Sequence, residues 1–151
     1  MRQIRVFLLC IILVLGFVHP CAAVEASSEN VIFYEEKTNE DGITTITVIT
    51  SHGDQARSTN KTYTKKSTSI KNGTIIADIW ITGTFQYDGT TVSVVSKSIS
   101  KCETYDGWSF KQSSFTSSGG TITLEGKLTK LIVLNADISI SLSCDKNGNI
   151  S

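Results

Sequence analysis

The feature that most constrains this chain is a regular alternation of apolar and polar side chains. In ADISISLSC, residues 136–144, every second residue is apolar or a cysteine, and Asp or Ser stands between them. In TITLEGKLTK, residues 121–130, the apolar residues Ile122, Leu124 and Leu128 share one phase. Because a β-strand points successive side chains to opposite faces, both stretches predict half-buried antiparallel strands.

Six further runs rich in β-branched residues indicate strands. They are residues 31–36, 43–50, 62–70, 74–88, 91–102 and 108–115. Turn signals separate the runs, and Asn-Gly and Asp-Gly favour tight hairpins because these residues tolerate positive φ. The signals are Asp41-Gly42, His52-Gly53-Asp54, Asn72-Gly73, Asp88-Gly89, Asp106-Gly107, Gly119-Gly120 and Asn147-Gly148. We therefore predict an all-β fold: a single antiparallel β-sandwich, immunoglobulin-like or similar, of about seven or eight strands, with a small barrel as the alternative.

The N-terminal segment has the organisation of a secretory signal peptide. Arg2 and Arg5 precede a nearly continuous apolar run over residues 6–18, and small residues follow it. That run is too short for a transmembrane helix. Cys21 follows a His-Pro pair, which fits lipoprotein processing poorly. The sequence therefore predicts a secreted, extracellular protein without a lipid anchor.

The small residues allow cleavage after Ala23 or after Ala26. The expected organisation is a signal peptide over residues 1–23, a flexible tail over 24–30 and one β-sandwich domain over 31–151. No later segment is apolar for about 20 residues, so we expect no stable membrane span after processing.

The charge balance limits the partners. The chain has 14 basic and 14 acidic residues, and removal of Arg2 and Arg5 with the signal peptide leaves 12 against 14, a net charge of −2. A protein this close to neutrality lacks the basic surface that attracts nucleic acids or anionic membranes. We therefore expect no nucleic-acid partner.

Two of the four cysteines, Cys10 and Cys21, leave with the signal peptide, and Cys102 and Cys144 remain. Two cysteines in an exported domain predict one disulfide. Each of them ends a predicted strand, and Cys144 lies on the apolar face of its strand. Cys102 is out of phase with Ile99 unless a bulge intervenes. We expect a Cys102–Cys144 bridge. Whether a bulge brings Cys102 into the phase that the bridge needs is left open.

Candidate catalytic groups are few. His52, the one histidine after residue 23, lies in a polar segment, which favours a loop residue over a member of a Ser-His-Asp triad. One histidine and two cysteines do not supply a zinc site. Glu35-Glu36 and Glu40-Asp41 match the carboxylates of a glycoside hydrolase only in residue type, since neighbours on a strand point to opposite faces. We predict no catalytic residue and no cofactor.

The last segment, SLSCDKNGNIS, has some features of a calcium loop. Asp145, Asn147 and Asn149 stand at positions 1, 3 and 5 of such a loop. Gly148, however, is at position 4, whereas an EF-hand places its glycine at position 6. We therefore expect a turn and no metal.

The aromatic residues are the candidate binding residues. Trp80 is out of phase with Ile79 and Ile81, so the pattern places it on the polar face of its strand. A Trp in such a position can stack on a sugar ring or anchor a protein partner. Trp108 follows a turn, with Tyr105 nearby. The alternatives are that Trp80 lies beneath a second layer or loop and that Trp108 belongs to the core.

Three motifs, in order, resemble a known group of proteins. ITGTFQYDGTTVSV is followed by YDGWSF and then by ISLSCDKNGNIS, and the shared positions are residues 82–89, Trp108 and residues 144–148. Over residues 75–151 the chain is similar to small exported proteins from Gram-positive gut bacteria. The resemblance implies export and a β-rich fold, and it implies no catalytic residue because that group has no assigned activity. Cys102 lies further from the Tyr-x-Gly stretch than the corresponding cysteine of that group.

Together these features predict a secreted, non-catalytic protein that binds an extracellular ligand, either a glycan, a cell-wall component or a protein. Two other functions stay open from the sequence. An extracellular hydrolase would need two carboxylates about 5–10 Å apart in a cleft. A bacteriocin-like toxin would need a large exposed apolar face.

Overall fold

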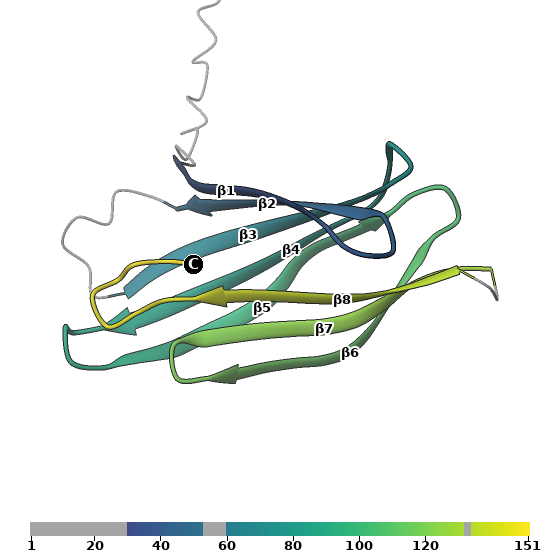
Figure 1. Ribbon diagram of the computed structural model, residues 1–151. Coiled ribbons are helices and arrows are strands. Elements are labelled where there is room, and N and C mark those ends of the chain that lie inside the picture. The colour runs from purple at the N-terminus through teal and green to yellow at the C-terminus, as the bar shows by residue number, and fades with distance from the viewer. Residues whose placement is uncertain (1–29, 53–59, 132–133) are drawn as a thin grey trace, which may run out of the picture.

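The computed structural model describes residues 30–52, 60–131 and 134–151, which form eight antiparallel strands (Figure 1). The strands are β1 (Asn30–Thr38), β2 (Ile43–Ser51), β3 (Asn60–Lys71), β4 (Thr74–Tyr87), β5 (Val92–Thr104), β6 (Ser109–Ser118), β7 (Thr121–Lys130) and β8 (Leu134–Ser143). Every predicted run is a strand, so the all-β prediction is confirmed. Within the described ranges, no helix is long and apolar enough to cross a membrane.

The predicted signal peptide and both of its cleavage sites lie outside the described residues. So does most of the predicted tail, residues 24–30. The last residue of that tail, Asn30, begins β1, so the strand starts one residue earlier than the sequence predicted.

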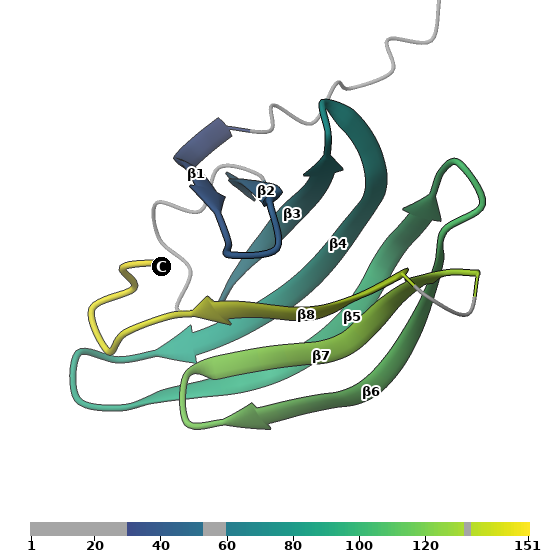
Figure 2. The ribbon, with the colours of Figure 1, turned by 45° about the vertical axis from the view of Figure 1, so that its right-hand side comes forward.

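Within each sheet, every strand pairs with its neighbours in the sequence. β1 to β5 form a five-stranded sheet in chain order, and β6 to β8 form a three-stranded sheet. Figure 2 shows the chain leaving β5 and entering the second sheet at β6. Because all pairings are between consecutive strands, the hairpin turns help to set the register of each pair.

Two tight turns, one in a hairpin and one between the two sheets, contain the residues that their backbone geometry requires. Between β3 and β4, Asn72 and Gly73 have φ angles of 52° and 76°. Between β5 and β6, Asp106 and Gly107 have φ angles of 52° and 73°. Two consecutive positive φ angles are typical of a type I′ turn, which favours Asn-Gly and Asp-Gly. The tight turns predicted at these two sites are confirmed.

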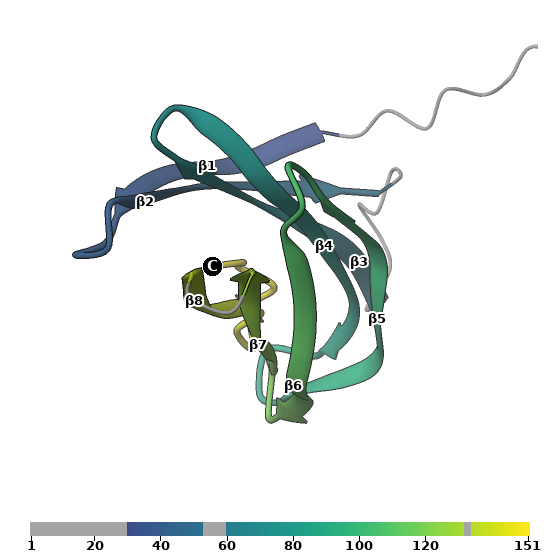
Figure 3. The same cartoon turned by 90° about the vertical axis from the view of Figure 1, so that its right-hand side faces the viewer.

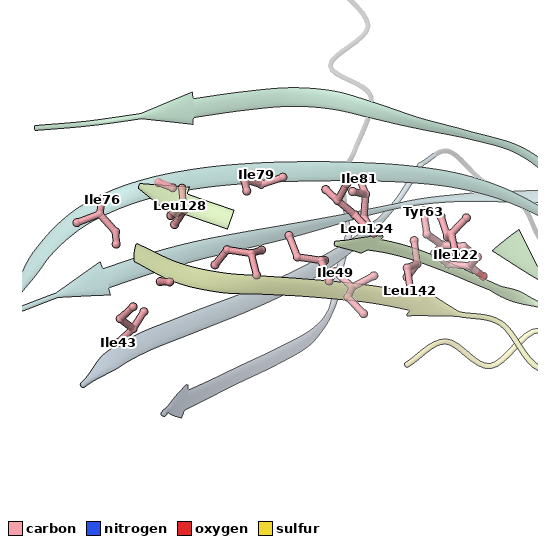
Figure 4. Packing of buried hydrophobic residues seen from close by; sticks show 14 of the residues in the cluster. Ile43, Ile49, Tyr63, Ile76, Ile79, Ile81, Ile122, Leu124, Leu128 and Leu142 are labelled. Atoms are coloured by element: carbon pink, nitrogen blue, oxygen red, sulfur yellow. The ribbon is translucent and has the colours of Figure 1, made fainter. Parts of the chain in front are cut away.

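One hydrophobic core lies between the two sheets (Figure 4). Its main contributors are Ile79, Ile81 and Phe85 from β4, Ile122, Leu124 and Leu128 from β7, and Ala136, Ile138, Ile140 and Leu142 from β8. Burying one such Ile or Leu side chain contributes about 1.5–3 kcal/mol. The apolar faces predicted for residues 121–130 and 136–144 are therefore confirmed.

At the start of β4 the predicted phase is wrong by one residue. The alternation placed Ile75 on the face of Ala77, but Ile75 is 45% exposed whereas Ile76 is 2% exposed. The cause is a register shift in the β3–β4 pair, where Ser69 pairs with Ala77 but Ile70 pairs with Ile75. Ile76 is the extra residue, and a bulge turns its side chain into the core.

The predicted disulfide is not present in this structure, where Cys102 and Cys144 are both free. Cys102 pairs with Ile79, near the start of β4. Cys144 precedes a loop in which the Lys146 carbonyl accepts a hydrogen bond from the Gly89 N–H, just beyond the end of β4. The part of β4 from Ile79 to Tyr87, roughly 25 Å of strand, therefore separates the two positions. A disulfide needs Cα atoms about 4.4–6.8 Å apart.

The three-stranded sheet covers only part of the five-stranded one. Its strands pack against β4 and β5. In Figure 3 the larger sheet curves around β7 and β8, and its β1–β2 end extends past β8. The inner side of β1 is therefore left without a covering strand, whereas that of β2 is covered in part, since Ile43 and Ile49 are buried.

Candidate functional site

A groove lies where β1 and β2 extend past the free edge of β8. Its volume is about 410 Å³. β1, β2 and β3 form one wall, and the other comes from residues 139–141 of β8. The lining side chains that carry hydroxyl groups are Thr38, Thr45, Thr47, Ser67, Ser139 and Ser141. Hydrogen-bonding groups therefore dominate this concave surface.

The local sequence explains why this wall is polar. On β2 the inward phase runs through Ile43, Thr45, Thr47 and Ile49, so two hydroxyl residues stand between two aliphatic ones. Across the sheet, Thr47 pairs with Ser67 of β3. The apolar phase is thus interrupted over the part of the sheet that β8 does not cover.

Two hydroxyl groups in the groove are almost fully enclosed. Thr47 is 8% exposed and Ser67 is 4% exposed. Among the described residues, neither side chain has a hydrogen-bond partner. A buried hydroxyl without a partner costs about 1–3 kcal/mol, and native proteins contain few of them. The groove therefore contains polar groups that a ligand could satisfy.

Charged side chains also line the groove. At its mouth the Lys37 ammonium lies 2.7 Å from the Glu35 carboxylate. Lys65 of β3, which also lines the groove, donates a hydrogen bond to the backbone carbonyl of Ser141 on β8. Burial lowers the pKa of Lys65, and the nearby Glu35 carboxylate offsets part of that effect.

The outer face of the five-stranded sheet contains Trp80, as the sequence predicted. Trp80 stands directly between Lys66 on β3 and Lys101 on β5 in the strand register. Each ammonium nitrogen is 4.9 Å from the centre of a Trp80 ring, within cation–π range. Trp80 is half-buried, and the two lysines occupy the surroundings that a stacked sugar would need.

Tyr105 belongs to a charged network beside Trp80. Its hydroxyl lies 3.1 Å from an oxygen of Asp78 and 3.1 Å from an oxygen of Glu103, so it can donate to either. Asp78 also accepts a hydrogen bond from the Thr68 hydroxyl and lies 3.1 Å from the Lys66 ammonium. This network satisfies Asp78, which is only 6% exposed.

The same network argues against hydrolysis at this pair of carboxylates. The Asp78 and Glu103 oxygens bound to Tyr105 are at most 6.2 Å apart, twice 3.1 Å. A glycosidase would need one of the two carboxyl groups to be protonated. Hydrogen bonds from Lys101 and from Tyr105 instead lower the pKa of Glu103, which keeps it ionised. Asp78 is held by three partners.

Trp108 is a core residue. It is 6% exposed and belongs to the buried cluster, which confirms the alternative that the sequence left open. Lys71 lies over its ring at 6.0 Å. The structure therefore brings Trp80 and Tyr105 to one network on the outer face and places Trp108 elsewhere, so the three aromatic residues do not form one site.

The remaining candidates are structural. His52 Nε2 lies 2.7 Å from the Thr64 hydroxyl oxygen. The Asp145 carboxylate accepts bonds from the Asn147 and Asn149 backbone N–H groups and from the Asn149 side chain, at 2.7–2.8 Å. These bonds, the Asn149 side chain first, lower the pKa of Asp145. The terminal loop is thus a turn held by its own carboxylate, and no group of metal-binding side chains occurs among the described residues.

The groove was not predicted from the sequence. One signal was available: Thr45, Thr47 and Ser67 have the inward phase of otherwise aliphatic strands. No protein-family model, curated protein or solved structure matches this chain significantly. Only the geometry of the groove therefore indicates what it could bind.

Proposed function

We propose that this chain is a secreted, non-catalytic β-sandwich protein that binds a hydroxyl-rich extracellular ligand, a glycan or cell-wall component, in the groove between β1–β3 and β8. The observation that supports it is the pair of buried hydroxyls, Thr47 and Ser67, that lack protein partners in the described part of the chain. Sugar hydroxyls both donate and accept hydrogen bonds, as these side chains do. Because pairing follows chain order, a simple meander describes the proposed sandwich better than an immunoglobulin-like Greek key.

The test is binding by the purified protein on a glycan array, followed by titration calorimetry with the best ligand. Thr47→Val removes one hydroxyl and keeps the shape of the side chain. Loss of one hydrogen bond should weaken binding about 3- to 10-fold, and Thr47→Val with Ser67→Ala should weaken it further. Thr50→Val on the outer face of the same strand is the matched control and should bind like the native protein. Equal affinities for all variants would overturn the groove as the site.

A second candidate function is docking of a protein on the outer face. Tyr34, Val48, Lys66 and Trp80 follow one another in register across β1 to β4, and Tyr34 is 61% exposed. Aromatic residues in such a row are typical anchors of protein interfaces. Trp80→Ala separates the two candidates, because it should leave binding in the groove unchanged.

A further inference from the structure

Lys65 occupies an unusual position for a lysine. In the register of the sheet it stands between Ile49 of β2 and Ile81 of β4, and both of these side chains are 0% exposed. An aliphatic residue would extend the core at this point without a desolvation cost. The sequence instead places an ammonium group in the lining of the groove.

The charge of Lys65 is only partly compensated by the protein. An ammonium group has three N–H donors, and within the described residues Lys65 has one hydrogen-bond acceptor, the Ser141 carbonyl. The carboxylate that lines the groove, Glu35, is paired with Lys37 at 2.7 Å. The groove thus contains two ammonium groups, Lys37 and Lys65, and one carboxylate, a net charge of +1.

We infer that the ligand of the groove carries an anionic group, a carboxylate or a phosphate, and that the Lys65 ammonium binds it. This inference rests on the proposed function, because it names the class of ligand for the same site. Thr47 and Ser67 would bind hydroxyl groups of the ligand, and Lys65 would select an acidic sugar chain or a sugar-phosphate polymer over a neutral one. The bond is a charge-assisted hydrogen bond, which is stronger and shorter than a neutral one.

Lys65 could also have a purely structural role. An inward-pointing lysine can protect a free strand edge from pairing with another chain, and Lys65 caps a carbonyl on the free edge of β8. The two roles differ in what they predict. An edge-protecting lysine would control self-association without affecting the choice between charged and neutral ligands.

The experiment compares two probes with the same sugar chain, one anionic and one neutral. Trigalacturonic acid and its fully methyl-esterified form are titrated into the native protein and into Lys65→Gln, and each variant is checked for folding by circular dichroism. We expect the native protein to bind the acid at least 10-fold more tightly than the ester. Lys65→Gln should lose most of that difference and leave the affinity for the ester unchanged. Lys111→Gln, an exposed lysine on β6, is the matched control.

A glycerol-phosphate oligomer forms a third arm and distinguishes a phosphate from a carboxylate as the anion. Equal binding of acid and ester would overturn the role of Lys65 and leave the proposed function standing. No binding of any of the three probes or of any glycan on the array would overturn both. Lys65→Met tests the structural role. If this variant dimerises and still discriminates between acid and ester as the native protein does, Lys65 protects the edge of β8 and the inference is overturned.

Discussion

The inner face of the five-stranded sheet has two halves with different surroundings. On β4, the inward residues Ile79, Ile81 and Phe85 pack against the second sheet, and none is more than 1% exposed. On β1 and β2, Glu35 and Thr47 occupy inward positions and line the groove beside β8, the edge strand of the second sheet. Both halves follow the same alternation of side chains, so the difference lies in what each half faces.

The comparison separates two properties of a sheet. The alternation along each strand decides which face a side chain belongs to. The number of strands in the opposing sheet, three against five, decides whether that face is covered. Covered inward positions are aliphatic because their burial stabilises the fold, whereas uncovered ones can carry groups that bind a ligand.

The largest expected effect comes from the covered half. Leu124→Ala should lower the free energy of unfolding by about 2–5 kcal/mol, because Leu124 is 0% exposed and its truncation leaves a cavity. Urea denaturation measures the change. A loss below about 1 kcal/mol would mean that the core beneath the second sheet is loosely packed, and the contrast between the halves would disappear.

Much of this covered half could be predicted from the sequence. The eight strands and the inward phases of β7 and β8 follow from short-range alternation, which one strand displays by itself. The inward phase at Ile76 could not be predicted, because it depends on a register shift between β3 and β4. On β5 a similar register shift between Ile99 and Lys101 turns Cys102 to the side of Ile79. The bulge that the predicted disulfide required is therefore present, but Cys102 and Cys144 lie too far apart to form it.

The groove could not be predicted for a different reason. Thr45 and Thr47 showed only that the inward face of β2 is partly polar. Whether that face meets solvent, a strand or a ligand depends on where β8 lies, and β8 is about 90 residues away in the chain. Lys65 was equally uninformative, because a lysine in a strand is predicted to lie on the surface unless its neighbours in the sheet are known.

The outer face should respond more weakly than the core. Trp80→Ala should lower the free energy of unfolding by about 1–2 kcal/mol, because the half-buried ring and its cation–π contacts with the Lys66 and Lys101 ammonium groups are lost. Trp108→Ala, in the core, is the comparison and should cost about 3–5 kcal/mol. Equal losses in the two variants would show that Trp80 is a core residue.

In the half beside the groove, a substitution should change the free energy of unfolding in the opposite direction. Thr47→Val replaces a buried hydroxyl that has no protein partner among the described residues. The free energy of unfolding should rise by up to about 1 kcal/mol or stay unchanged. Thr64→Val is the control, because the Thr64 hydroxyl bonds to Thr82 at 2.8 Å and its removal should destabilise the fold. A clear loss of stability in Thr47→Val would remove the support for the groove.

The reactivity of the two cysteines tests the difference between covered and uncovered positions without a stability measurement. Cys144, at the end of β8, is 4% exposed, whereas Cys102 is exposed although it has an inward phase on β5. A thiol reagent should therefore modify Cys102 quickly and Cys144 only after unfolding, and peptide mapping should show both Cys102 and Cys144 as free thiols. Burial raises the pKa of both thiols, so both reactions should be faster at alkaline pH. A bridged form in peptide mapping would contradict the structure.

The smallest expected effect concerns the network on the outer face. Partial desolvation, and then the hydrogen bonds to Glu103 and Asp78, raise the pKa of Tyr105 to about 12. The ordinary pKa of a tyrosine is about 10, so the folded state holds this proton more tightly than the unfolded state. The contribution of Tyr105 to stability is therefore complete below pH 10 and is lost as the pH rises toward 12.

An alkaline titration of tyrosinate absorbance measures this group directly. Tyr105→Phe should remove a phase with a midpoint of about 12. Glu103→Gln should move that phase to lower pH, because a neutral amide stabilises the phenol less than a carboxylate does. Neither variant should alter the groove, since Tyr105 and Glu103 do not line it. If either one changed ligand binding as much as Thr47→Val, the two faces of the sheet would be one functional unit, and the contrast between its inner halves would not explain binding.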